Sequence, residues 1–123
     1  MAHISEIRDN YIYVKMTTPK FELREKGGLI EEIEKIQTVK PNLVIDCENI
    51  EQISDEEAFR IKFLRDKNQE RAGFIILCNL KDNLSQKLES LGLVCVPTVD
   101  EAIDYIYFEE IENEFLSDFE DEE

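Results

Sequence analysis

The chain has 123 residues, of which 42% are hydrophobic and 35% charged, and its formal net charge is −15 at pH 7. These values predict one globular domain. A membrane-spanning helix is not expected, because no apolar run approaches the ~20 residues that cross a bilayer. The first residues show no basic segment followed by an apolar core, so we expect no secretory signal and a cytoplasmic protein.

The negative charge is concentrated in the last third of the chain. Residues 88–123 hold 13 acidic side chains and no basic one, whereas residues 1–87 hold all 14 basic side chains and the remaining 16 acidic ones (29 − 13). Phosphate contacts need clustered Lys and Arg, so we expect neither nucleic acid nor an anionic membrane as a direct partner.

The N-terminal part predicts a β-hairpin, a helix and a buried strand. Ile4–Arg8 and Tyr11–Met16 are short runs of the β-branched and aromatic residues that strands prefer, separated by a two-residue turn. Apolar spacing of i, i+3 and i+4 then predicts a helix from about residue 21 to 37, or from about residue 28 if Gly27-Gly28 delays its start. The continuous apolar run at residues 43–45 is typical of a strand covered on both faces.

The middle of the chain alternates helix and strand. A helix over residues 55–70 is predicted, and its inward-facing residues are Ala58, Ile61, Phe63 and Leu64, with Phe59 as a further candidate. An apolar strand, Phe74–Cys78, follows, and then a helix over residues 82–91. Gly92 comes directly after that helix, where a left-handed cap is favoured.

The C-terminal part predicts a third short parallel strand, Val94–Val96, and a last helix. Thr98 and Glu101 fit a capping box at its start, and its inward-facing residues are Val99, Ala102, Ile103 and Ile106. A second apolar stripe (Tyr105, Phe108, Ile111 and Phe115) indicates a helix to about residue 114 that covers the hairpin or the sheet edge. We therefore expect a domain over residues 1–108, and an acidic helix extension with a disordered tail over residues 109–123.

The tail allows a second interpretation. Phe115, Leu116 and Phe119 lie among carboxylates, and such a segment could be a linear motif that docks into a basic groove on a partner.

Strands that alternate with helices predict an α/β fold. The expected architecture is a mixed sheet with an N-terminal antiparallel hairpin, parallel strands and about four helices.

The most informative segment is the elbow between the strand at residues 43–45 and the next helix. It places Ser54, Asp55, Glu56 and Glu57 at a helix N-terminus, where charge acts strongly. Ser54 is a suitable N-cap, and Glu57 can close a capping box with it. Together with Arg60, these residues form the expected partner-binding surface.

The order of the elements resembles the STAS domain, the fold of bacterial anti-sigma-factor antagonists and of the cytoplasmic part of sulfate transporters. The resemblance spans about Ile4 to Tyr107. It is carried by LVIDCENI, QISDEEAF, FIILCNL, DNLSQKLESLGL and VPTVDEAIDYI, with Leu91-Gly92-Leu93 and Glu101-Ala102 typical of the family. The resemblance implies a module that binds a switch kinase or anti-sigma factor.

In that family the elbow usually carries Asp-Ser-Ser-Gly, and its first serine is phosphorylated by the partner kinase. These four positions fall on Ser54, Asp55, Glu56 and Glu57, so a carboxylate, Asp55, stands at the phosphoacceptor position. Three interpretations remain. Asp55 and Glu56 imitate a permanently phosphorylated serine; the four residues only cap their helix; or Ser54 is a displaced phosphoacceptor.

The sequence shows no pattern for catalysis, a metal or a cofactor. It has no glycine-rich phosphate loop and no nucleophile paired with a candidate base. Three cysteines lie in apolar runs and are expected to be buried, reduced thiols: Cys47, Cys78 and Cys95. A zinc site is not expected, because its four ligands would have to be these three cysteines and His3, and none of them are separated by the short spacing typical of zinc ligands. The protein is therefore not expected to be an enzyme.

Two further roles stay open. The C-terminal sequence resembles small bacterial STAS-like proteins, some of which are labelled ribonuclease Z. That enzyme holds two zinc ions with a cluster of histidines and aspartates, which a chain with one histidine cannot supply, so we expect no nuclease activity and take the label as at most a hint about a neighbouring gene or a partner linked to RNA processing. The first alternative is a scaffold or accessory subunit for another enzyme, and the second is a small-molecule or nucleotide sensor. A monomer or weak dimer is expected.

Overall fold

The computed structural model describes residues 3–8, 11–19, 42–70 and 73–121, with only the backbone for His3 and for residues 113–121. The predicted helix over residues 21–37 and the predicted turn of the hairpin lie outside the described residues.

Five strands form one mixed sheet in the order β1-β2-β3-β4-β5. Strands β1 (His3–Ile7) and β2 (Ile12–Met16) pair antiparallel. The next three pair in parallel and are β3 (Leu43–Asp46), β4 (Ile75–Cys78) and β5 (Val94–Val96). The predicted mixed sheet with an N-terminal hairpin is confirmed.

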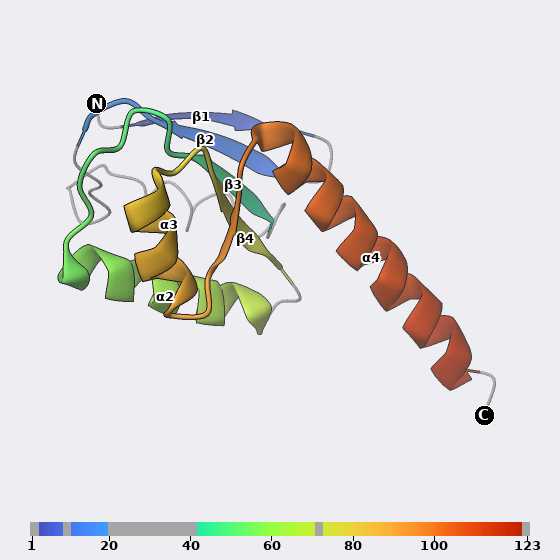
Figure 1. Ribbon diagram of the computed structural model, residues 1–123. Helices are drawn as coiled ribbons and strands as arrows, with labels where there is room; N and C mark the ends of the chain where they lie inside the picture. The colour runs from blue at the N-terminus through green and yellow to red at the C-terminus, as the bar shows by residue number, and fades with distance from the viewer. Residues whose placement is uncertain (1–2, 9–10, 20–41, 71–72, 122–123) are drawn as a thin grey trace.

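Helices cover both faces of this sheet (Figure 1). Helices α2 (Asp55–Gln69) and α3 (Asp82–Glu89) pack on one face, and α4 (Val99–Asp121) packs on the other. Side chains alternate along β3, so that Leu43 and Ile45 join the first core and Val44 joins the second. Burial on both faces explains the continuous apolar runs of β3 and β4.

Three predicted helix caps are present. The backbone N–H of Glu57 donates to Ser54 Oγ over 3.1 Å at the start of α2, and that of Glu101 donates to Thr98 Oγ1 over 3.1 Å at the start of α4. Gly92 follows α3 with φ of +84°, a left-handed conformation that favours glycine. Arg65 of α2 donates to the carbonyl of Gly92 over 2.5 Å and so ties α2 to this turn.

Helix α4 is longer than the sequence predicts. It continues to Asp121 instead of ending near residue 114, and it passes residue 108, the expected domain boundary, without a break. Ala102 and Ile106 are buried against the sheet, and Asn42 Nδ2 donates to Glu110 Oε1 over 2.7 Å. Beyond this contact the helix extends away from the body of the molecule (Figure 1).

Candidate functional site

The elbow is fixed to the core before helix α2 begins. Cys47, Ile50 and Ile53 are buried, so three points of the loop after β3 are anchored in the apolar core. Asn49 Nδ2 donates to the carbonyl of Met16 over 3.2 Å. The first turn of α2 is therefore presented from a well-packed support.

The predicted surface residues of this turn differ in exposure. The side chains of Asp55 and Glu56 are 85% and 66% exposed, whereas that of Glu57 is 10% exposed. The Ser54 hydroxyl accepts the Glu57 N–H, which confirms the predicted cap. Asp55 and Glu56 are thus the carboxylates that a partner can reach, and Glu57 contributes mainly to the local structure.

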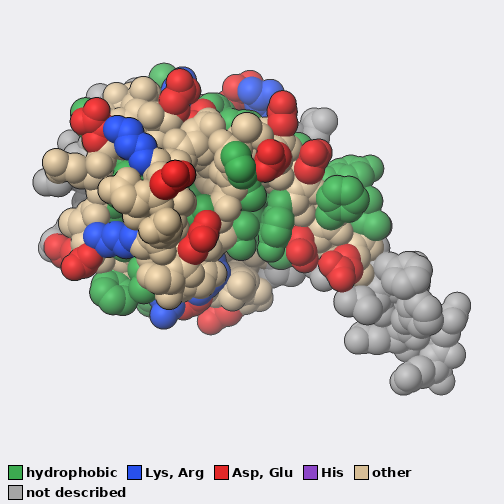
Figure 2. Space-filling view, viewed as in Figure 1, with side chains coloured by type: hydrophobic (Ala, Val, Ile, Leu, Met, Phe, Trp, Pro, Cys, Tyr) green, Lys and Arg blue, Asp and Glu red, His purple; other side chains and the backbone are tan. Residues whose placement is uncertain are grey.

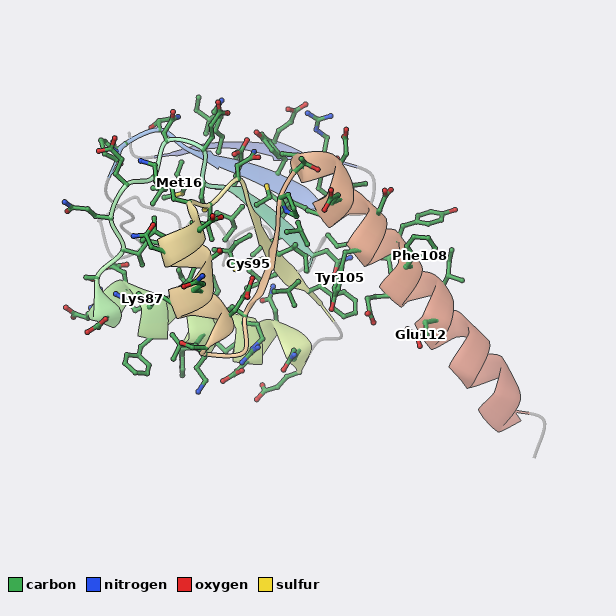
Figure 3. The ribbon with its side chains drawn as sticks, in the orientation of Figure 1. Met16, Lys87, Cys95, Tyr105, Phe108 and Glu112 are labelled. Carbon is green, nitrogen blue, oxygen red and sulfur yellow. The ribbon has the colours of Figure 1, made fainter. Side chains whose placement is uncertain are left out.

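Every carboxylate of the turn has a basic partner within the chain. Lys87 Nζ of α3 lies 2.7 Å from Asp55 Oδ1 and also donates to the carbonyl of Ile53 over 2.8 Å. Arg60 pairs with both Glu56 and Glu57. Figure 3 shows Lys87 beside the first turns of α2. The elbow is therefore a network of ion pairs, and its negative charge is largely compensated.

Lys87 also sets the protonation of Asp55. Its hydrogen bond, and then its positive charge, hold the pKa of Asp55 below the usual range. Asp55 would be ionised at neutral pH even without Lys87, so the effect of this contact is to keep the carboxylate charged at more acidic pH. The sequence alone did not identify Lys87, because it is 32 positions away; the only hint was that it is the last basic residue of the chain.

Phe59 and Phe63 point outward, which corrects the sequence prediction that placed Phe63 in the core and named Phe59 as a further candidate. They are 59% and 62% exposed and lie one helical turn apart on the side of α2 opposite Ile61. Lys67 Nζ lies 5.0 Å from the ring centroid of Phe63. We call Phe59 and Phe63 the α2 ridge; hydrophobic side chains are visible over α2 at the lower left of Figure 2.

A second polar cluster surrounds Asp46 at the carboxyl end of β3. Its buried carboxylate accepts hydrogen bonds from Tyr13 Oη (2.6 Å), Asn79 Nδ2 (2.9 Å) and the N–H of Glu48 (3.1 Å). Burial alone would raise its pKa, but these hydrogen bonds and the charge of Lys15 lower it overall. The carboxylate oxygens of Asp46 thus already accept three hydrogen bonds from within the chain. We interpret Asp46 as a structural residue that joins β2, β3 and the end of β4.

The three cysteines are free thiols. Cys47 and Cys78 are buried and Cys95 is half-buried. Burial raises the pKa of all three, to about 12 for Cys78 and Cys95, so they stay protonated at neutral pH. In the described part of the chain, no group of three or more His, Cys, Asp or Glu side chains could hold a metal ion.

The candidate tail motif lies on helix α4. Phe115, Leu116 and Phe119 fall within its helical backbone, but their side chains are outside the described residues. No helix among the described residues is long and apolar enough to cross a membrane.

The arrangement of strands and helices matches solved structures of anti-sigma factor antagonists. TM1081 of Thermotoga maritima, named as a candidate anti-sigma factor antagonist, superposes with a TM-score of 0.65 at 15% identity, over 85% of this chain and 94% of that chain. An NMR structure of TM1081 gives a TM-score of 0.64 at 13% identity, over 84% and 86% of the two chains.

A serine-to-glutamate variant of RsbS from Moorella thermoacetica superposes with a TM-score of 0.64 at 14% identity, over 84% of this chain and 95% of that chain. No protein-family model and no curated protein matches the sequence. At these identities the likeness shows the fold, and the predicted STAS-like fold is confirmed.

Proposed function

We propose that this chain, which has the fold of the anti-sigma factor antagonists, is a non-enzymatic interaction module that binds a protein partner through the start and outer side of α2. The observation that carries the proposal is the α2 ridge. Two phenylalanines, both more than half exposed, lie one turn apart directly after the exposed carboxylates of the elbow. Adjacent exposed aromatic side chains beside charged groups are typical of protein-binding surfaces.

The partner that best fits this fold is a switch kinase or an anti-sigma factor. TM1081, whose structure this chain resembles, is named as a candidate anti-sigma factor antagonist, and the resemblance in sequence implies a partner of that class. The partner would bury the α2 ridge and would offer polar or basic groups to Asp55 and Glu56.

We further propose that phosphorylation at the usual position does not control this interaction. Asp55 occupies that position and has no hydroxyl to accept a phosphoryl group. The Ser54 hydroxyl accepts the Glu57 N–H as a helix cap, a contact that phosphorylation would disturb next to three carboxylates. Binding would then be constitutive.

The test is quantitative affinity purification of the tagged chain from its native cell, with mass spectrometry. A switch kinase or anti-sigma factor should be enriched with the unmodified chain, and at least about ten-fold less with Phe59→Ser/Phe63→Ser, because each substitution removes exposed aromatic contact area.

Ile7→Ser is the matched control, since Ile7 is 58% exposed, close to the 59% of Phe59, but lies on β1. It should leave the enrichment unchanged. Equal enrichment with the Phe59→Ser/Phe63→Ser variant would show that the α2 ridge is not the contact surface.

A further inference from the structure

The side of α4 that faces away from the sheet carries a second exposed apolar group. Its residues are Tyr107, Phe108 and Ile111, which are 59%, 70% and 47% exposed. We call these three residues the outer α4 face. Figure 2 shows a hydrophobic group where α4 leaves the body, and Figure 3 labels Phe108 on this stretch of the helix.

The orientation of this face is fixed by contacts on the opposite side of the helix. Ala102 and Ile106 are buried in the sheet-facing core, and Glu110 accepts a hydrogen bond from Asn42 at the start of β3. The helix cannot turn its outer face inward without breaking these contacts. Within the described part of the chain, no core cluster includes Tyr107, Phe108 or Ile111.

The spacing of the three residues suits helical recognition. Tyr107 and Ile111 are four positions apart and Phe108 and Ile111 are three apart, so they form one contiguous strip. Single exposed apolar residues are ordinary on protein surfaces. A strip of two aromatic residues and an isoleucine on a projecting helix instead resembles the anchors with which an amphipathic helix enters a groove.

Charge decides which occupant fits. Residues 88–123 contain 13 acidic residues and no basic one, and Asp104, Glu109 and Glu112 lie within one turn of the strip. The negative field is felt locally, because Glu109 and Glu112 add to burial in raising the pKa of Tyr105. A second copy docking by the same face would bring two such fields together, which like-charge repulsion disfavours.

We propose that the outer α4 face is a docking site for a basic amphipathic segment of a protein partner, with apolar residues on its contact side and Lys or Arg at the rim. The apolar residues of that segment would cover Phe108 and Ile111, while its basic residues would pair with the carboxylates beside them. This site is independent of the α2 ridge, because α2 and α4 lie on opposite faces of the sheet (Figure 1).

The test uses a synthetic amphipathic helix of Leu and Lys with one Trp on its apolar side. The chain contains no Trp, so the emission of the peptide Trp reports only its own burial. Titration with the whole chain should shift this emission to the blue. Affinity should fall at least about ten-fold for Phe108→Ser/Ile111→Ser, with Tyr107→Ser as a second, independent variant.

Two controls separate apolar docking from simple charge attraction. The Ile7→Ser variant should bind the peptide as the unmodified chain does, within about two-fold, because Ile7 is exposed on β1 and lies outside the outer α4 face. A peptide of equal charge with a scrambled order should bind at least about ten-fold more weakly. Circular dichroism should give the same melting curve for all variants, because the substituted side chains are exposed.

Three results would overturn the proposal. The first is no binding of the amphipathic peptide by the unmodified chain, and the second is equal binding by Phe108→Ser/Ile111→Ser. The third is a dimer in sedimentation velocity that Phe108→Ser/Ile111→Ser abolishes, because the occupant would then be a second copy.

Discussion

Lys87 connects three parts of the molecule through one ammonium group. From α3 it pairs with Asp55 and donates to the carbonyl of Ile53, and so joins the loop, the first turn of α2 and α3. A partner that binds Asp55 must compete with this contact. Since the Asp55 side chain is largely exposed, the ion pair is weak enough to exchange.

The first prediction concerns Lys87→Met. Removing the ammonium group should raise the pKa of Asp55 towards its ordinary value of about 3.9, because the hydrogen bond and the charge that lower it are both lost. NMR titration of the Asp55 carboxyl carbon measures this. Lys81→Met is the control, since Lys81 pairs with Glu51 instead. An unchanged Asp55 titration would show that the Lys87 contact is not populated in solution.

The second prediction concerns Asp46→Asn. In the folded protein the Asp46 carboxylate accepts hydrogen bonds from Tyr13 and Asn79. An amide group has only one acceptor oxygen, and its N–H groups would face one of these donors. The free energy of unfolding at pH 7 should therefore fall by about 1–3 kcal/mol. Urea unfolding measures it. Asp66→Asn is the control; that side chain is 55% exposed, and the change should stay within about 0.5 kcal/mol.

Asp46 also predicts a pH dependence. Its folded pKa lies below the unfolded value of about 3.9, so the unfolded chain binds the proton more readily. The contribution is therefore complete above that value and is lost as the pH falls through the folded pKa. The loss of stability at acid pH should be smaller in Asp46→Asn; equal acid profiles would contradict the role given to Asp46.

The two sides of helix α2 have different environments. Ala58, Ile61 and Leu64 pack into the core, while the α2 ridge faces outward. A partner bound to the α2 ridge, as proposed, would leave the core-facing side of the helix undisturbed, provided that the first turn is held in place. Ser54 provides that hold through its cap.

The third prediction concerns Ser54→Ala. It should lower the free energy of unfolding by about 1 kcal/mol, the usual contribution of an N-cap hydroxyl, as measured by urea unfolding. Ser85→Ala is the matched control, because its hydroxyl donates to Asp82 at the surface of α3, and it should change stability by less than about 0.5 kcal/mol. If the two variants were equally stable, capping would not account for Ser54.

At the scale of the whole molecule, local signals in the sequence predicted most of the fold. The apolar runs of β3 and β4, the caps at Ser54 and Thr98, and the left-handed Gly92 depend on neighbouring residues, so a single sequence contains them. The STAS-like order of elements followed from the same signals.

The features that the sequence did not predict depend on contacts between distant residues, or were predicted from residue type alone. Lys87 reaches Asp55 only after α3 packs beside α2. Phe63 was placed in the core because phenylalanine is usually buried, although the helical period puts it opposite Ile61. The end of α4 was placed too early because the acidic run that ends the chain was expected to be disordered, whereas the helix continues to Asp121.

Because the sheet lies between α2 and α4, the two helices present their exposed residues on opposite sides of the molecule. A protein seated on α2 would leave α4 uncovered, and the reverse is also true, since the sheet separates them. Occupancy of one side would not sterically block the other. Two different proteins bound at the two proposed surfaces would therefore form a ternary complex, in which substitutions on one side would change the affinity of one protein alone.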